Sequence, residues 1–226
     1  MLANGGQQVT TTLLKINNLS HRFAQRGTVL DNVSFTLNSG DKLALTGANG
    51  AGKSTLLQLL VGLIPRQSGD ILAQDKLQKT EADFIKLRQQ VGLVFQDPDD
   101  QLFCPSVLED VMFGPLNQGF TVIEARQNSQ KILKKLGLEH LSDRIASELS
   151  GGEKRLVTLA TVLVMQPKVL LLDEPTNALD TQAKQKLLAL LQSLDQAMLI
   201  ISHDQLFLQQ LATGYLELKD AKLKRI

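Results

Sequence analysis

Apolar residues along this chain recur at two spacings, one typical of buried strands and one typical of amphipathic helices. Short runs that are almost wholly apolar occur at residues 91–95, 169–172 and 198–201, as in parallel strands covered on both faces. Helical spacing predicts helices at residues 53–63, 80–90, 122–136 and 181–194. Because such strands alternate with helices, the pattern predicts an α/β fold with a mainly parallel central sheet.

Two regions depart from this α/β pattern. Short β-type runs dominate the N-terminal part, at residues 13–16, 29–37 and 42–46, and residues 69–77 have a hairpin pattern. Residues 97–165 have the pattern of helices with polar faces, which predicts an inserted helical subdomain. Residues 1–12 are polar and are expected to form a flexible tail, so that residues 13–226 make up a single domain.

Composition and charge narrow the class of protein. The chain has 226 residues, 43% of them apolar, and its 24 basic and 23 acidic residues leave a formal charge of +1. A near-neutral chain offers no global attraction to nucleic acid, and no nucleic-acid partner is expected. The single cysteine, Cys104, excludes an intrachain disulfide. The longest apolar stretches, residues 56–64 and 157–165, are too short to span a bilayer, so any membrane spans would belong to a partner.

A glycine-rich loop between the strand pattern at residues 42–46 and the next helix is the strongest chemical signal. It matches the motif G-x-x-x-x-G-K-[ST] with Gly47, Ala48, Asn49, Gly50, Ala51, Gly52, Lys53 and Ser54. Glycines let successive backbone N–H groups point at a phosphate, Lys53 adds a positive charge, and Ser54 offers a hydroxyl to Mg²⁺. Thr55 is expected to add a further phosphate contact. The loop therefore predicts a site for a nucleotide phosphate together with Mg²⁺.

Two carboxylates, Asp173 and Glu174, follow the apolar run at residues 169–172. Ligands of open α/β sheets bind at the carboxyl ends of the strands. Asp173 is expected to hold Mg²⁺, directly or through water, and Glu174 to orient or deprotonate an attacking water. Taken alone, an Asp-Glu pair would indicate a solvated strand end. A nucleotide kinase could also use an Asp at the end of this strand. The loop around Lys53 is what favours a functional site.

The segment Leu-Ser-Gly-Gly-Glu at residues 149–153 precedes a helical pattern at residues 154–165. Ser150 followed three residues later by Glu153 fits the capping-box pattern of a helix start. A Ser-Gly-Gly helix start is also an anion site. Because the loop around Lys53 already serves the chain's own nucleotide, this second site is free for a phosphate from elsewhere.

The order of these motifs resembles that of the ATP-binding cassette (ABC) ATPases, the nucleotide-binding subunits of ABC transporters, from residue 13 onward. Residues 149–153 resemble the signature motif of that family, and residues 178–180 resemble its D-loop. Gln96 resembles the Q-loop glutamine and His203 the switch histidine. Phe23 lies where the family has an aromatic residue that stacks on adenine, although a lone aromatic equally suits the core. No Asn-Lys-x-Asp guanine-reading motif is present, which favours ATP.

The resemblance implies a P-loop NTPase fold with an N-terminal antiparallel β subdomain. It also implies a head-to-tail dimer, either a homodimer or a pair with a similar ATPase. Each ATP would lie between the Lys53 loop of one subunit and residues that the other contributes in trans, namely Ser150, Gly151, Gly152, Glu153 and Asp180. The family also implies that Gln96 contacts Mg²⁺ and the attacking water. His203 would contact the γ-phosphate and hold Glu174 in place. Taken alone, Gln96 and His203 would be ordinary polar residues beside a strand and a helix.

Two stretches are similar to the ATPases of energy-coupling factor importers, especially the cobalt and nickel branch. They are QDPDDQLF at residues 96–103 and EDVMFGPLN at residues 109–117. In that family the first stretch lies at the groove that receives a coupling helix of the transmembrane subunit. The expected coupling residues are Asp97, Asp99, Asp100 and Gln101. A basic coupling helix would complement their charge, and a solvated loop is the default alternative.

Leu156, Thr181 and Ala221 depart from the family pattern, which commonly has arginine, proline and glycine there, and none of them is an expected phosphate or metal ligand. We therefore expect an ATPase that uses Mg²⁺ and works at the cytoplasmic face of the cell membrane. Its expected partners are integral membrane transmembrane and substrate-binding subunits, and cobalt or nickel ion is the favoured cargo. The alternatives are an importer ATPase for another solute, such as biotin, and a non-transport ABC ATPase.

Overall fold

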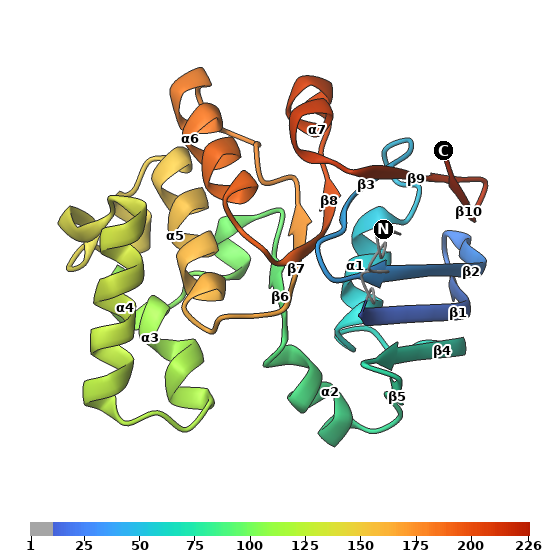
Figure 1. Ribbon diagram of the computed structural model, residues 1–226, viewed down its shortest axis with the longest axis horizontal. Coiled ribbons are helices and arrows are strands. Elements are labelled where there is room, and N and C mark those ends of the chain that lie inside the picture. The colour runs from blue at the N-terminus through green and yellow to red at the C-terminus, as the bar shows by residue number, and fades with distance from the viewer. Residues whose placement is uncertain (1–10) are drawn as a thin grey trace, which may run out of the picture.

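A six-stranded sheet lies at the centre of the computed structural model, which describes residues 11–226 (Figure 1). Its strand order is β10-β9-β3-β8-β7-β6, and all neighbouring pairs are parallel except the β9–β10 hairpin. The strands are β3 (Lys42–Thr46), β6 (Val91–Val94), β7 (Val169–Asp173), β8 (Ala197–Ile201), β9 (Gly214–Lys219) and β10 (Lys222–Arg225). The predicted α/β fold with a mainly parallel sheet is confirmed.

A second, antiparallel sheet lies at the right of Figure 1, with the order β2-β1-β4-β5. Its strands are β1 (Thr12–Phe23), β2 (Gly27–Asn38), β4 (Ser68–Ala73) and β5 (Lys76–Leu77). This sheet confirms the predicted N-terminal antiparallel β subdomain. Thr12, which the sequence assigned to the tail, is the first residue of β1, and the rest of the predicted tail up to residue 10 lies outside the described residues.

Helices flank the central sheet and also form a separate lobe. At the left of Figure 1, α3, α4 and α5 pack together around a core of their own, as expected for the inserted helical subdomain. The helices are α1 (Lys53–Leu60), α2 (Glu81–Arg88), α3 (Val107–Asn117), α4 (Val122–Leu136), α5 (Gly151–Leu163), α6 (Thr181–Gln192) and α7 (Gln205–Leu211). Short 3₁₀ helices lie at Pro98–Asp100, Glu139–Leu141 and Ala146–Glu148.

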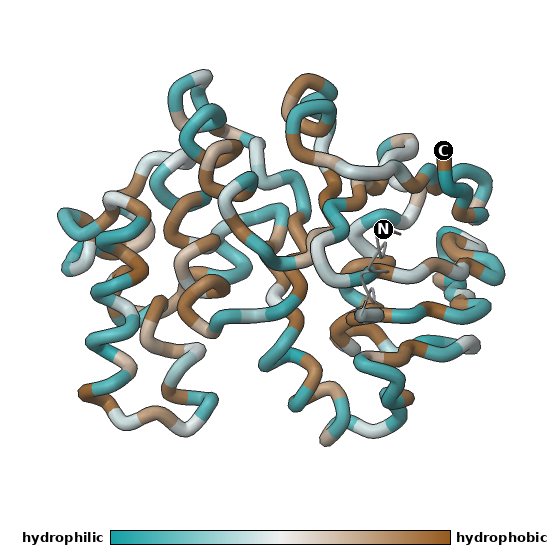
Figure 2. Tube along the Cα trace, in the orientation of Figure 1, coloured by the Kyte–Doolittle hydropathy of each residue, from teal (hydrophilic) through white to brown (hydrophobic). Residues whose placement is uncertain are grey.

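Side chains along the central strands alternate between two cores because successive residues of a strand point to opposite faces. On β7, Leu171 belongs to the core that includes α1 and the antiparallel sheet. Leu170 and Leu172 belong to a core shared with α5, α6 and α7. Figure 2 shows hydrophobic residues along these strands and hydrophilic residues on the outer turns of the helices. Burial on both faces explains why this strand is apolar at every position before Asp173.

Local sequence signals account for several helix ends. α4 matches its predicted bounds, since a capping box of Thr121 and Glu124 starts it and Gly137, with a φ of 72°, ends it. α1 ends at Leu60, earlier than predicted, and Gly62 follows in the left-handed region with a φ of 69°. Within residues 11–226, none of the helices combines the length and the apolar composition needed to cross a bilayer.

Candidate active site

The loop between β3 and α1 contains two positions where backbone atoms of other strands approach so closely that only glycine fits. Gly47 has a φ of 140°, and a Cβ added there would lie 2.3 Å from the carbonyl oxygen of Leu218. Gly52 has a φ of 105°, and its added Cβ would lie 3.0 Å from the carbonyl oxygen of Val29. Because α1 begins at Lys53, backbone N–H groups at the helix start face the space in front of the loop.

Lys53 is held across this loop. Its Nζ donates hydrogen bonds to the carbonyl oxygens of Gly47, at 2.7 Å, and Ala48, at 3.0 Å. The side chain is buried, and this burial lowers the pKa of Lys53, while the carboxylates of Glu174 and Asp173 act in the opposite direction. The ammonium group therefore bonds the loop and lines the same pocket as the carboxylates of Asp173, which ends β7, and Glu174, which follows it.

Asp173 is the last residue of β7, and one of its carboxylate oxygens has no hydrogen-bond partner. Burial is the largest cause that raises its pKa, and the charge of Glu174 adds to it, while a hydrogen bond with Ser54 and the charges of Lys53 and Arg155 oppose the rise. Its Oδ1 atom is buried and has no hydrogen-bond partner. An unpartnered buried carboxylate oxygen is costly unless a cation or water contacts it.

Glu174 adopts a left-handed backbone conformation, with a φ of 50°, directly after β7. Its backbone N–H bonds the carbonyl oxygen of Ile201, at 2.9 Å, which ties it to the end of β8. The backbone N–H of His203 donates to Glu174 Oε2 at 3.1 Å, and His203 Nε2 lies 3.3 Å from Glu174 Oε1. A strained backbone held by a neighbouring strand is typical of a residue whose side chain must be aimed.

These groups line one pocket of about 320 Å³. Of the predicted site residues, it brings together Phe23, Asn49, Gly50, Gly52, Lys53, Ser54, Thr55, Gln96, Asp173, Glu174 and His203. Phe23 is the last residue of β1, and its ring lies edge to face against the ring of His21, with 4.7 Å between the ring centroids. Arg26, in the turn after β1, also lines the pocket and was not predicted.

The signature segment does not line this pocket. Ser150 caps α5 in a capping box: Ser150 Oγ accepts from Glu153 N–H, and Glu153 Oε2 accepts from the backbone N–H of Ser150 at 2.8 Å. The Ser150 hydroxyl, which donates to Glu153 Oε2 at 2.7 Å, is the largest cause that lowers the pKa of Glu153, and the Ser150 backbone N–H adds to it. Asp180 caps α6 by accepting from Ala183 N–H at 2.7 Å. Ser150, Gly151 and Asp180 are exposed, so an incoming group has access to them.

The predicted coupling residues divide into two kinds. Asp97, Asp99 and Asp100 are exposed around a short 3₁₀ helix, and Asp99 forms an ion pair with Lys154 of α5 at 2.6 Å. Gln101 is instead turned inward, where its amide accepts from the backbone N–H of Phe95 and donates to α5. Its side chain therefore supports the loop and does not extend the acidic surface.

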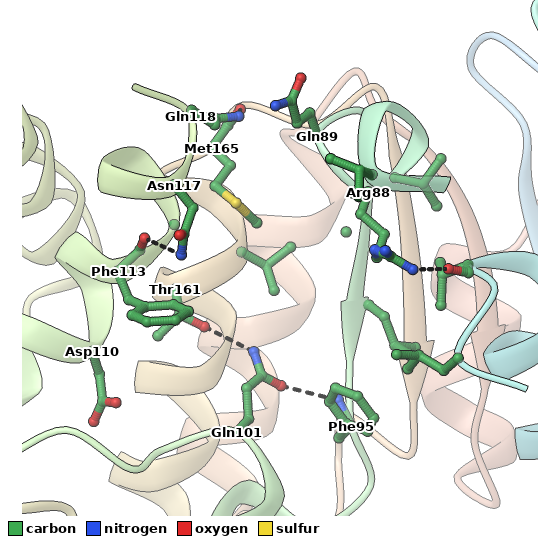
Figure 3. Close-up of a pocket in the computed structure, with 18 of the residues that line it drawn as sticks. Arg88, Gln89, Phe95, Gln101, Asp110, Phe113, Asn117, Gln118, Thr161 and Met165 are labelled. Atoms are coloured by element: carbon green, nitrogen blue, oxygen red, sulfur yellow. Dashed lines mark hydrogen bonds between the residues drawn. The ribbon is translucent and has the colours of Figure 1, made fainter. Parts of the chain in front are cut away.

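A mostly apolar groove of about 550 Å³ lies beside the acidic segment. Figure 3 shows Phe113 and Met165 from the helical subdomain on one side and Arg88 of α2 on the other. Phe103 and Phe113 pack edge to face at 5.0 Å and remain 63% and 48% exposed. Exposed aromatic pairs in a groove mark interaction surfaces. The family resemblance implied a groove beside residues 96–103, but the sequence did not predict its aromatic lining, because the lining residues come from separate elements.

Arg155 of α5 is a further residue that the motifs did not reveal. Its guanidinium group is buried, donates to the backbone carbonyl of Gln96, and acts on the pKa of Asp173 through its charge. In the sequence it is one of two adjacent basic residues after the signature segment. No sequence signal distinguishes it from a solvated charge.

Comparison with known proteins agrees with this geometry. A family model described as ABC transporter matches residues 30–177. A putative ABC transporter ATP-binding protein of Brucella suis is 52% identical over 195 residues, which cover 86% of this chain and 81% of the relative. The energy-coupling factor transporter ATP-binding protein EcfA of Methanosphaera stadtmanae is 39% identical over 86% of this chain and 71% of its own length.

A solved structure is also similar over nearly the whole chain. The structure of cbiO1 from Clostridium perfringens, described as part of the ABC transporter complex cbiONQ, has a TM-score of 0.81 and 35% sequence identity. The match covers 95% of this chain and 87% of that one. Together with EcfA, it confirms the predicted resemblance to energy-coupling factor ATPases. The chain belongs to the ABC transporter family as an ATP-binding subunit, and it is an ATPase.

Proposed function

We propose that this chain hydrolyses ATP with Mg²⁺ as the peripheral subunit of an energy-coupling factor importer, on the cytoplasmic face of the cell membrane. The observation that carries the proposal is the convergence of Lys53, Asp173, Glu174 and His203 in one pocket at the strand ends. Phosphoryl transfer needs positioning and charge stabilisation more than covalent chemistry, and these are what a loop cation and two carboxylates supply.

The residues at the pocket fit Mg²⁺. Asp173 has an unpartnered buried oxygen, and Ser54 and Gln96 offer further oxygen atoms, the donor type that Mg²⁺ prefers. Within residues 11–226, no group of three His, Cys, Asp or Glu side chains is placed to hold a metal ion by itself. Mg²⁺ that acts with a nucleotide is usually held by one or two protein side chains together with phosphate oxygens and water. When bound, Mg²⁺ would neutralise charge on the phosphates.

In the proposed mechanism Glu174 orients and deprotonates the attacking water. Its carboxylate is fixed by the backbone N–H of His203, and the His203 ring lies on its other oxygen. His203 in turn contacts the γ-phosphate, while the Lys53 ammonium stabilises the phosphate charge from the loop side. The phosphate-loop residues Gly47, Ala48, Asn49, Gly50, Ala51, Gly52, Ser54 and Thr55 supply N–H and hydroxyl contacts, and Phe23 stacks on the adenine ring.

A dimer completes the site in this proposal. Ser150, Gly151, Gly152, Glu153 and Asp180 lie outside the pocket of their own chain, and Ser150 and Asp180 are exposed helix caps. The start of α5 is an anion site, so a second copy arranged head to tail, or a similar ATPase, would place it on the γ-phosphate.

The membrane partner would dock in the groove between α2 and the helical subdomain. Its floor is apolar and aromatic, and the acidic segment with Asp97, Asp99 and Asp100 lies beside it. An amphipathic helix with an apolar face and basic residues complements both features. The names of the relatives EcfA and cbiO1 support an energy-coupling factor complex with transmembrane and substrate-binding subunits, and we propose cobalt or nickel ion as the cargo.

Glu174→Gln tests the proposal. The glutamine oxygen can still accept the hydrogen bond from His203 N–H, so the substitution removes the base but keeps this contact. Loss of the general base lowers kcat by about 10²- to 10⁴-fold while ATP binding persists, so an ATP-bound dimer accumulates in size-exclusion chromatography. Lys53→Ala abolishes turnover by removing the loop cation, and the exposed Glu139→Gln is the matched control. Phosphate release that continues in both site variants would disprove the assignment.

Co-purification tests the transport role. The full chain should co-purify with a multispanning membrane protein from cells that produce it, and uptake of Co²⁺ or Ni²⁺ should stop in the Glu174→Gln strain. Co-sedimentation with ribosomes, without any membrane protein, would instead support a non-transport ABC ATPase.

A further inference from the structure

The backbone of Phe95 and Gln96 is fastened to the helical subdomain. These residues follow β6, which ends at Val94. The Phe95 N–H donates to Gln101 Oε1 at 3.1 Å. Arg155 then donates from Nη1 to the Phe95 carbonyl oxygen at 2.7 Å and from Nη2 to the Gln96 carbonyl oxygen at 2.5 Å. Three backbone polar groups of this segment therefore bond to side chains that α5 carries or holds.

Gln101 acts as a bridge because its amide has partners on both sides. While Oε1 accepts from Phe95, Nε2 donates to the Thr158 carbonyl oxygen at 3.0 Å and to Thr161 Oγ1 at 2.8 Å. Figure 3 shows the amide between Phe95 and Thr161. Thr158 and Thr161 both belong to α5. The end of β6 is thus linked to the middle of α5 through one side chain.

Arg155 is a buried charge, and burial lowers its pKa even though Asp173, Asp97 and Glu174 favour the charged form. Its side chain is 3% exposed, and its Nε atom has no hydrogen-bond partner. A buried guanidinium group bonded only to neutral carbonyls stabilises a fold less well than an apolar side chain of the same size. Arg155 bonds the Gln96 backbone and lines one pocket together with Gln96 and Asp173, and this position points to a role in the reaction.

We propose that Arg155 and Gln101 are positioning residues, which fasten the Gln96 segment to α5 so that Gln96 moves with the helical subdomain as one body. The proposal rests on the proposed function, in which Gln96 would help to hold Mg²⁺ and the start of α5 would contact the ATP of the other subunit. When Ser150 binds the ATP of the other subunit, Gln96 would then change position at the ATP site of its own chain. Arg155 couples the two sites, so hydrolysis in the dimer is cooperative.

The test uses full-length variants with ATP and Mg²⁺. Arg155→Met and Gln101→Met each lower kcat by about 10- to 100-fold, because misplacement by an ångström costs this much, while the Kd of a fluorescent ATP analogue without Mg²⁺ stays within about twofold. The Hill coefficient for ATP falls towards one. Arg155→Lys, which keeps the charge and can reach one carbonyl, restores part of kcat. The exposed Arg126→Met on α4 is the control for loss of an arginine.

A double variant separates positioning from general stability. If both residues act through the Phe95 and Gln96 backbone, Arg155→Met combined with Gln101→Met lowers kcat less than the product of the single effects. Multiplicative effects, an unchanged Hill coefficient or a parallel loss of nucleotide affinity would overturn the proposal. If Arg155→Met does not fold, Arg155→Lys and Gln101→Met give the same comparison. Failure of the proposed function is seen separately, as turnover that survives Glu174→Gln.

Discussion

Gly47→Ala tests whether the shape of the phosphate loop depends on contact with β9. An added Cβ would lie 2.3 Å from the Leu218 carbonyl oxygen, where ordinary contact begins at 3.4 Å, so the two must separate by 3.4 − 2.3 = 1.1 Å. Leu218 is fully buried and its strand pairs with β3, so the sheet resists this shift. The φ of 140° at Gly47 adds backbone strain. Together these effects cost about 2–5 kcal/mol of unfolding free energy.

Thermal unfolding and nucleotide titration measure the effect. A loss of this size lowers the Tm of a chain of this length by about 5–15 °C, and the displaced N–H groups weaken ATP binding by about tenfold or more. The matched control is Gly40→Ala, which also has a positive φ, of 80°, but has no atom within 4 Å of the added Cβ. It should cost only about 1–2 kcal/mol and leave ATP binding intact. Equal Tm and ATP affinity in the two variants would refute the reasoning.

Three further predictions concern single side chains. Phe23→Ala weakens ATP binding by about 1–3 kcal/mol but leaves inorganic triphosphate binding unchanged, as calorimetry can measure, whereas equal losses would place Phe23 in the core only. Burial is the largest cause that raises the pKa of Cys104 from 9.0 to about 11, and a hydrogen bond with Asp110 is the next. Near pH 8 the folded chain therefore holds less of the reactive thiolate, and Cys104 should react with a disulfide reagent about 100-fold more slowly than in the urea-unfolded chain. Hydrogen bonds from Thr80 and Lys79 lower the pKa of Asp83 from 3.8 to about 2. The ionised Asp83 side chain therefore contributes its full stability above pH 3.8, and this contribution disappears as the pH falls through about 2. Asp83→Asn should therefore lower the urea midpoint at neutral pH, with a difference that shrinks across that range.

Local patterns were enough to predict the fold class and the phosphate-binding part of the site. The apolar run before Asp173 predicted a strand buried on both faces, and all its residues are buried. The spacing of glycines, Lys53 and Ser54 predicted a loop at a helix start, where the structure has it. Each of these features depends on residues adjacent in the chain, whose backbone conformation and burial period are set by short-range sterics and hydrophobic spacing.

The contacts of Arg155 and Gln101 illustrate what tertiary structure alone decided. Gln101 was predicted to be a surface residue of the coupling segment. Its amide instead joins Phe95 to Thr161, which lies 60 residues after Gln101 along the chain. The position of Phe23 at the pocket and the groove beside Phe113 likewise combine distant elements. The sequence by itself determined the elements and the loop chemistry, because these follow from neighbours in the chain. Only packing decided which polar side chains face one another, because strand order and helix placement bring together residues that no local spacing relates.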